Sequence, residues 1–212
     1  MDPALTLAFL EERIQKIREE ASLRAADLVQ RFVLVANKAG CQVEEVKDLQ
    51  EAGYSIAKLA RSKGVQLIQV SSTSLLERLA LETTLEGSGI TITGPDPEGI
   101  LKADLGISDA GLGIAETGSL LIHLDAPDTR LITMLPPIHI ALLQREDLVE
   151  SLEEGLLITR HRTLHAQAQG QPSYISWVTG PSRTGDIEHV LTIGAHGPKE
   201  LFIILVPRFE GK

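Results

Sequence analysis

The first 37 residues carry an amphipathic pattern. Apolar residues recur at steps of three and four, the spacing that places side chains on one face of an α-helix. Charged residues occupy the other face, so we predict one long helix over 5–37. It either lies across its own domain or acts as an arm for a partner, and 5–21 is the more detachable half because its apolar stripe is narrow. The apolar positions are Leu7, Leu10, Ile14, Ile17, Ala21, Ala25, Leu28 and Phe32.

Strands and helices are expected to alternate in the next part of the chain. Asp48 with Glu51, and Ser74 with Glu77, have the spacing of capping boxes, in which an N-cap side chain and a glutamate three residues on satisfy backbone amides at a helix start. Consecutive strands joined by helices form a parallel sheet with right-handed crossovers. The predicted strands are 41–46, 65–70 and 89–93.

The pattern changes after residue 104. Four apolar runs follow one another between Leu105 and Leu143 with no helical spacing, which predicts several adjacent strands. A helix from about Glu146 to Ile158 comes next. The remaining predicted elements are a polar loop at 161–172, strands at 174–178, 191–195 and 201–206, and a loop with a short helix at 180–190.

No internal repeat or linker divides the chain. We therefore predict a helical arm over residues 1–40 and a single α/β domain over residues 41–212, with a parallel-rich sheet sandwiched by helices.

Composition narrows the functional class. The chain has 212 residues, 43% of them hydrophobic and 3% aromatic, and a net charge of −9. The apolar content suffices for a buried core and argues against disorder. Negative charge and scarce aromatic residues argue against nucleic-acid binding. Because Cys41 is the only cysteine, the chain forms no internal disulfide and offers no thiolate cluster for zinc or iron–sulfur.

The order of charged and apolar residues predicts no targeting or membrane-spanning segment. Its start has no basic stretch followed by a long apolar run, so no secretory signal is predicted. The longest apolar stretch, 131–143, is interrupted by Pro136 and Pro137 and is too short to span a bilayer. We expect a cytoplasmic protein.

The first stretch with candidate chemistry is GIAETGS at 113–119. Gly118 lets the backbone approach a ligand, and the neighbouring hydroxyls and amides can hold an anion. Glu116 is a candidate general base or nucleophile if it is buried. The alternative is a tight β-turn whose glutamate caps backbone amides.

The second stretch is TGPSRTGDIE at 179–188. Between a strand and a helix, free amides and the helix dipole favour anions, and Arg183 adds a guanidinium suited to phosphate or carboxylate. Asp186 and Glu188 would compete with an anion and could instead cap the helix, orient Arg183 or hold a cation. The alternative is a capped helix start without a ligand.

The third stretch is GAHGPKE at 194–200. His196, flanked by small residues, can act as an acid, a base or a hydrogen-bond donor, or it can lie in a turn built by Gly197 and Pro198. Ligands of parallel α/β sheets bind at the carboxyl ends of the strands. The second and third stretches both follow predicted strands, so we expect them to meet the first at that edge.

The remaining histidines carry weaker signals. His161 and His165 are four residues apart in a loop-like segment, which makes a metal site improbable. His123 and His139 lie in apolar runs and are more typical of satisfied core histidines. No G-x-S-x-G elbow is present to anchor a hydrolase triad.

GIAETGSLLI (113–122), GPSRTGDIE (180–188) and GAHGPKEL (194–201), in this order, closely resemble the lactate-utilisation (LUD) domain family, and in type the lactate-utilisation protein C subunits. Asp104 matches a further recurrent position. The resemblance implies a fold similar to those of ribose-5-phosphate isomerases, glucosamine-6-phosphate deaminases and CoA transferases. It also implies that Glu116, Thr117, Ser119, Ser182, Arg183, Thr184, Asp186 and His196 line the family's pocket, without settling their roles. Together with the residue chemistry above, this gives the catalytic candidates Glu116 and His196 and the ligand-binding candidates Thr117, Gly118, Ser119, Gly180, Ser182, Arg183, Thr184, Asp186, Glu188 and Gly197.

The resemblance also implies a function. The family serves a multi-subunit system that oxidises L-lactate to pyruvate, so we expect a non-redox component of an L-lactate dehydrogenase complex rather than a catalyst alone. No cofactor is expected on this chain, and iron–sulfur clusters are expected on partner subunits. The alternative is a stand-alone isomerase or CoA transferase that acts on a sugar phosphate or acyl-CoA with Glu116 as base or nucleophile. A third possibility is an assembly protein that docks a partner through residues 5–21.

Overall fold

A computed structural model describes residues 7–94, 96–171, 173–185, 191–194 and 196–208. The helices are α1 (Leu7–Leu23), α2 (Ala25–Lys38), α3 (Leu49–Ser62), α4 (Ser74–Glu77), α5 (Leu81–Thr84), α6 (Pro97–Ile100), α7 (Pro127–Met134) and α8 (Leu152–Ala168), with a 3-10 turn η2 (Arg145–Asp147). The strands are β1 (Gln42–Glu45), β2 (Leu67–Val70), β3 (Thr91–Thr93), β4 (Leu105–Ala110), β5 (Leu112–Ile114), β6 (Ser119–His123), β7 (Ile138–Gln144), β8 (Leu148–Val149), β9 (Ile175–Val178), β10 (Arg183–Gly185), β11 (Leu191–Ile193) and β12 (Glu200–Val206).

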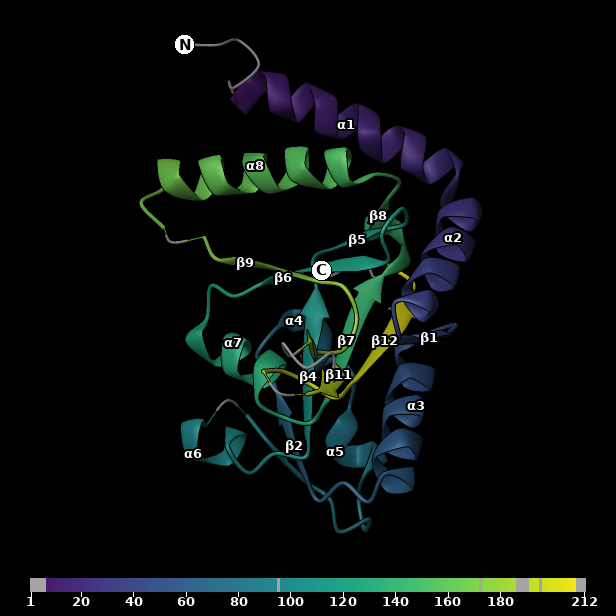
Figure 1. The fold of residues 1–212 in the computed structure, drawn as a ribbon, viewed down its shortest axis with the longest axis vertical. Coiled ribbons are helices and arrows are strands. Elements are labelled where there is room, and N and C mark those ends of the chain that lie inside the picture. The colour runs from purple at the N-terminus through teal and green to yellow at the C-terminus, as the bar shows by residue number, and fades with distance from the viewer. Residues whose placement is uncertain (1–6, 95, 172, 186–190, 195, 209–212) are drawn as a thin grey trace.

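A six-stranded sheet forms the centre of the molecule (Figure 1). Its order is β1-β12-β7-β4-β2-β3, and every neighbouring pair is parallel. The predicted parallel α/β class is therefore confirmed, as are the three early strands and the helix that follows the first of them. The longest strands, β7 and β12, lie inside the sheet, where apolar side chains are buried on both faces.

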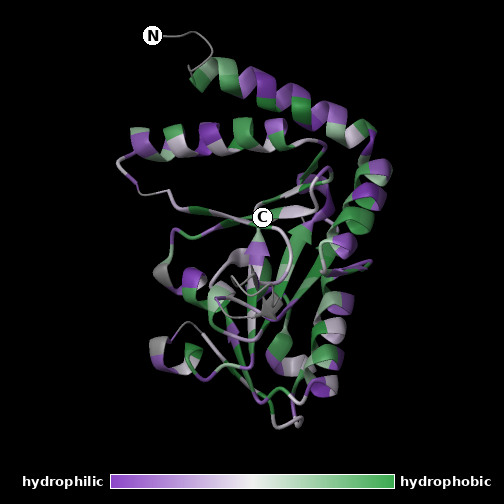
Figure 2. Cartoon of the chain, in the orientation of Figure 1, coloured by the Kyte–Doolittle hydropathy of each residue, from purple (hydrophilic) through white to green (hydrophobic). Residues whose placement is uncertain are grey.

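Both faces of this sheet are covered by helices. On β7, Ile140 and Leu142 belong to an apolar cluster with α3, whereas Ala141 and Leu143 belong to a second cluster with Phe32 of α2. This alternation follows from the two-residue period of a strand. Figure 2 shows the same arrangement: the central strands are largely hydrophobic, and the outer helices alternate between hydrophobic and hydrophilic positions.

A second sheet lies between the main sheet and α8 (Figure 1). Its order is β8-β5-β6-β9, with β5 antiparallel to β6 and β6 antiparallel to β9. The chain passes from β4 into β5 through Gly111 alone. The adjacent strands predicted between 105 and 143 thus exist, but they are divided between two sheets.

One helix was not predicted in that region. Helix α7 occupies Pro127–Met134, where the β-branched residues of the run at 131–135 favoured a strand. Pro127 in the first helical turn and Asp128 beside it are helix-start signals that outweigh this preference. The helix packs against β4, where a Cβ on Gly106 would collide with the backbone of Ile132.

The predicted N-terminal helix is interrupted. Arg24, with φ −117° and ψ 19°, separates α1 from α2. No glycine or proline marks this break in the sequence. Helix α1 buries Leu10, Ile14 and Ile17 on the side where it packs against α8, while α2 packs into the second apolar cluster. The division at residue 40 stays a prediction.

Helix α8 differs most from its prediction. It begins at Leu152, six residues later than expected, because η2 and β8 occupy residues 145–149. It continues through residues 161–168, which we predicted as a polar loop. Ser151 and Glu154 form its capping box, and the alanine, leucine and glutamine residues of its second half are good helix formers despite their polarity.

The predicted helix starts agree with the structure at one position and differ from it at others. Asp48 is the N-cap of α3 and accepts a hydrogen bond from the Glu51 amide, as predicted. The N-cap of α4 is Thr73 rather than Ser74. The helix predicted within 180–190 is also wrong over its described part, because residues 183–185 form β10, antiparallel to β11. Over the described parts of the chain, no helix is both long enough and apolar enough to cross a membrane.

Candidate functional site

The first motif forms the turn between β5 and β6. Gly118 has φ +66°, a conformation that side-chain-bearing residues rarely adopt. A Cβ at this position would lie 2.5 Å from the backbone nitrogen of Ala36 in α2. The glycine therefore allows the turn to pack directly against α2.

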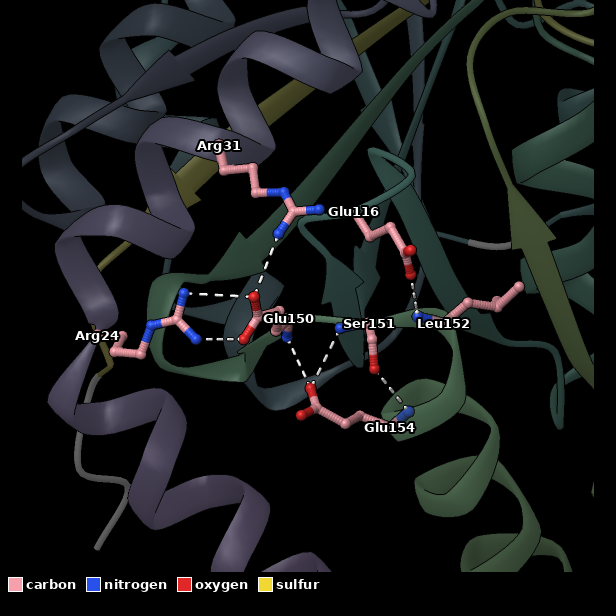
Figure 3. A network of polar contacts seen from close by, with 7 residues as sticks. All are labelled: Arg24, Arg31, Glu116, Glu150, Ser151, Leu152 and Glu154. Carbon is pink, nitrogen blue, oxygen red and sulfur yellow. Dashed lines mark hydrogen bonds and ion pairs between the residues drawn. The ribbon is translucent and has the colours of Figure 1, made fainter.

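Glu116 lies on the outer side of this turn. Its side chain is exposed, and Oε2 accepts a hydrogen bond of 2.9 Å from the backbone amide of Leu152 (Figure 3). That amide is one of the unpaired donors at the start of α8, so the carboxylate caps the helix and interacts favourably with its dipole. Glu116 is a candidate general base only if it is buried, and its exposed carboxylate supports the capping alternative instead.

Three hydroxyl groups join the first motif to the second. Thr117 Oγ1 donates to Ser119 Oγ at 2.7 Å, and Ser119 Oγ lies 2.6 Å from Thr179 Oγ1. Ser119 is 4% exposed, so this row of hydrogen-bonded hydroxyl groups runs from the protein interior toward the surface. The structure thus brings together two stretches that are 60 residues apart.

The second motif contacts the end of α2. Gly180 has φ +88°, and a Cβ there would lie 2.5 Å from the Ala39 carbonyl oxygen. Arg183 donates from Nη2 to that same oxygen at 3.0 Å. A guanidinium beside the last carbonyls of a helix is favoured by the helix dipole. Thr184 belongs to β10, whereas Asp186 and Glu188 lie outside the described residues.

The third motif pairs with the second. The Ser182 amide donates to Pro198 O at 2.9 Å, and the Gly194 amide donates to Ser182 O at 3.0 Å. Gly197 packs on Ser182, since a Cβ on Gly197 would lie 3.0 Å from its Cβ. His196 lies in the same loop and is exposed. The loops of the second and third motifs therefore meet, as predicted.

These loops lie at the opposite edge of the main sheet from the one predicted. Lys199 and Glu200 donate to Pro137 O, just before β7 begins, and the Arg183 contact with Ala39 lies just before β1. Both places are at amino ends of parallel strands. The prediction was wrong because β9 and β11, the strands preceding these loops, belong to other sheets, and the carboxyl-end rule concerns only the parallel sheet itself.

A charged network connects this region with the N-terminal helices (Figure 3). Arg24 forms two hydrogen bonds with the Glu150 carboxylate, and Arg31 Nη1 lies 3.3 Å from Glu150 Oε1. The Glu150 carbonyl accepts from the Glu116 amide at 2.9 Å. No sequence pattern indicates this network, because Glu150 is more than 100 residues from both arginines.

The capping box of α8 adjoins that network. Glu154 accepts from the amides of Glu150 and Ser151 at 2.8 and 3.2 Å, and its own amide donates to Ser151 Oγ at 3.2 Å. Figure 3 shows these groups beside the Glu116–Leu152 contact. The first motif, the start of α8 and the α1–α2 junction are thereby held together by backbone and side-chain hydrogen bonds.

Several singled-out polar residues have structural partners. Asp104 accepts from the amides of Gln66 and Leu67 at 2.8 and 3.0 Å and so fixes the start of β2. His139 Nε2 lies 2.9 Å from Ser108 Oγ, and burial lowers the pKa of His139 to about 4. This confirms the expectation of a satisfied core histidine. Burial also raises the pKa of the Cys41 thiol to about 11, which disfavours the reactive thiolate.

Metal binding finds no support in the described ranges. Within them, no group of three or more histidine, cysteine, aspartate or glutamate side chains is arranged to hold an ion. The described parts of the three motifs together form what we call the motif cluster (113–119, 179–185 and 194–200). It offers hydroxyl groups, an arginine and an exposed histidine, a set that suits an anion better than a cation.

Comparison with known proteins adds a family to this geometry. The model of the LUD domain family matches residues 29–206. "Lactate utilization protein C" of Oceanobacillus iheyensis is 34% identical over 105 residues, which cover 50% of this chain and 44% of that protein. The protein of the same name from Halalkalibacterium halodurans is 29% identical over 167 residues, which cover 78% of this chain and 69% of that protein.

A solved structure supports the fold. A DUF162 family protein from Deinococcus radiodurans superposes with a TM-score of 0.57 at 17% identity, over 86% of this chain and 98% of that one. At this identity the likeness concerns the fold alone. The chain spans less than half of the length of the Oceanobacillus protein.

Proposed function

The chain belongs to the LUD domain family, and from this membership we propose that it is a non-redox subunit of an iron–sulfur system that oxidises L-lactate to pyruvate. The observation that carries the proposal is the family match over residues 29–206, together with relatives named lactate utilization protein C. In this role the chain binds a small anionic ligand or a partner subunit, while electron transfer takes place on other chains.

The cysteine content supports the division of labour. Cys41 is the only cysteine of the chain, and it is buried beneath the end of α2. Iron–sulfur clusters are held mainly by several thiolates. A chain with one buried thiol therefore depends on partners for any such cluster.

The motif cluster is the part of the chain that we assign to the ligand. Arg183 is exposed, and a hydrogen bond from its Nη2 to Ala39 O fixes it at the end of α2. The hydroxyls of Thr117, Ser119 and Thr179 are hydrogen-bonded to one another, and the neighbouring Gly118 and Gly180 pack against the last residues of α2 and its C-cap. Arginine with hydroxyl donors is a combination that recognises carboxylates. The carboxylate of a 2-hydroxy acid or of its 2-oxo product fits this chemistry.

Affinity purification from the native cells tests the proposal. The tagged full-length chain is recovered from cells grown with and without L-lactate, and iron, visible absorbance and lactate oxidation are measured in each eluate. We expect co-purifying iron–sulfur partners and activity from lactate-grown cells. We expect neither iron nor activity in the isolated chain.

A second measurement assigns the ligand contact. In the reconstituted complex, Arg183→Gln should raise the KM for lactate about tenfold or more, since it removes a charge-assisted hydrogen bond. Arg145→Gln is the matched control, because Arg145 pairs with Glu45 at a distant part of the surface. Equal KM values in both variants would place the ligand elsewhere.

The stand-alone enzyme is the outcome that would replace this proposal. A pure homo-oligomer without iron-containing partners, or lactate oxidation by the isolated chain, would contradict the subunit role. A thermal-shift panel of sugar phosphates and acyl-CoA esters then tests the alternative, since a ligand that binds only the folded chain stabilises it. The capping contact of Glu116 gives that alternative no support.

A further inference from the structure

Arg162, in the second half of α8, is a cation that no carboxylate of the described residues contacts directly. Its side chain is partly buried. It donates from Nη2 to Gly111 O at 3.3 Å, and its Nη1 is hydrogen-bonded to His123 Nε2. A guanidinium keeps its protons, so His123 Nε2 is the acceptor and the His123 ring is neutral. Burial and Arg162 both lower the pKa of His123, which agrees with this state.

The surroundings of Arg162 do not neutralise it locally. Among the charged groups that the structure describes, no carboxylate oxygen lies within 4.0 Å of its guanidinium. Asp147 is close enough to attract it but forms its ion pair with Arg208, at 2.7 Å. Arg18 of α1 repels it. Burial and Arg18 both lower the pKa of Arg162, while Asp147 opposes them.

Two hollows meet at this residue. One, of about 750 Å³, lies between α1 and α8, and the other, of about 290 Å³, lies between α8 and the segment after β6. His161 and Arg162 line both. His161 Nε2 is shielded from solvent and has no hydrogen-bond partner among the described atoms, and Glu11 Oε1 stays 3.6 Å away. A buried polar atom without a hydrogen-bond partner is energetically unfavourable, and a bound ligand can supply the missing partner.

The acidic groups at the hollows are in part engaged elsewhere. Glu19 accepts from Gln15 at 3.1 Å, and Asp125 accepts from the Tyr174 amide at 3.0 Å. Glu11 is 60% exposed, and its Oε1 lies 3.6 Å from His161 Nε2. Against these stand two guanidinium groups and the His161 and His165 rings, whose centroids are 6.1 Å apart.

We propose that Arg162, His161 and Arg18 form a binding site for a small oxyanion, the carboxylate or phosphate group of a free small molecule, where the two hollows meet. The anion supplies the acceptor that His161 Nε2 lacks and places negative charge between two guanidinium groups that otherwise repel each other. The site lies outside all three sequence motifs. It therefore goes beyond the lactate-related function proposed above and stands or falls independently of it.

Titration calorimetry on the full chain tests the site directly. Inorganic phosphate and L-lactate are titrated separately, with sodium chloride holding the ionic strength constant. We expect saturable binding of one anion per chain for at least one of the two, and the pair of titrations separates phosphate from carboxylate. Arg162→Gln should weaken this binding about tenfold or more, because it removes hydrogen bonds from a charged donor.

Arg160→Gln is the matched control. It removes the same charge two residues away on the same helix, from a side chain that is exposed. We expect its affinity to stay within twofold of the wild-type value. A loss equal to that of Arg162→Gln would show a general electrostatic effect and overturn the proposal, as would the absence of saturable binding of either anion to the wild-type chain.

Histidine NMR signals provide a second readout. Binding of the anion should shift the ring signals of His161 at constant pH, because the anion accepts a hydrogen bond from the ring and changes its electrostatic surroundings. Glu11 on α1, Arg18 on α1, and Arg162 and His165 on α8 surround this ring, and the spectrum recorded without anion contains their contribution. If Arg162→Gln does not fold, His161→Asn and Arg18→Gln replace it. Unchanged affinity in both of these variants would overturn the proposal.

Discussion

Gly118 is the residue at which the first motif depends most directly on its backbone. The position has φ +66°, and the space for a side chain is filled by the backbone of Ala36. We expect Gly118→Ala to lower the free energy of unfolding by about 2–4 kcal/mol, from the left-handed strain together with displacement of the turn from α2. Urea denaturation followed by circular dichroism measures this change.

Gly87→Ala is the matched control for that substitution. Gly87 has a similar φ of +69°, but no atom lies within 4 Å of the added Cβ. Its cost should therefore be only about 1 kcal/mol. If the two variants lost equal stability, the packing of the turn on α2 would contribute nothing.

His139 makes the stability of the fold depend on pH. Its pKa in the folded protein is about 4, below the value of about 6.5 for an unfolded histidine. Between these values the unfolded chain binds a proton that the folded chain does not, so stability falls as the pH falls from about 6.5 to about 4. The expected slope is up to about 1.4 kcal/mol per pH unit.

The variant His139→Gln isolates this contribution. Burial raises the pKa of Asp109, which acts in the opposite direction at lower pH in both proteins and so cancels in the comparison. Unfolding free energies measured at pH 7 and pH 5 should differ by about 2 kcal/mol more in the wild type than in the variant. Identical differences would mean that His139 binds a proton equally well in the folded and the unfolded chain.

At the scale of elements, the contact between α1 and α8 decides whether the N-terminal helix belongs to its own domain. Ile14 is 7% exposed and lies on the face of α1 that meets α8. We expect Ile14→Ala to lower the free energy of unfolding by about 2–3 kcal/mol, through lost burial and the cavity it leaves. Thermal or urea unfolding measures the loss.

Leu23→Ala is the control, since Leu23 is 87% exposed at the end of the same helix. This substitution should lower the free energy of unfolding by less than about 0.5 kcal/mol. If Ile14→Ala left the stability of the isolated chain unchanged and weakened its recovery with partner subunits, the helix would instead be a partner-binding arm.

Local signals explain which elements could be predicted. The Asp48 cap and the regular apolar positions of α3 are contained in a short window of sequence, and they predict this helix correctly. The break at Arg24 is different, because Arg24 is held by Glu150, which is 126 residues away. Glu116 likewise finds its partner in the amide of Leu152. Contacts of this kind arise only from the assembled fold, so periodicity and spacing could not reveal them.

On the scale of the whole molecule, the same limit applies to the location of the motif cluster. Spacing predicted correctly that the loops of the second and third motifs meet, and they meet because β10, in the second motif, pairs antiparallel with β11, which precedes the third. It placed them at the wrong edge because it could not tell that β9 joins the second sheet. Sheet membership depends on strand pairing across the whole chain.

The boundary between arm and domain is also a whole-molecule property, and a pair of truncations tests it. A chain lacking residues 1–23 keeps α2, with Phe32 and Ala36 fully buried in the second apolar cluster. We expect it to fold and unfold cooperatively, with reduced stability because α8 loses the cover of α1. A chain lacking residues 1–40 loses that part of the core as well and should not show a cooperative transition. Circular dichroism during urea denaturation distinguishes the two. If the shorter chain also unfolds cooperatively, the boundary lies at residue 40, and the whole N-terminal segment, α2 included, is separable from the α/β domain.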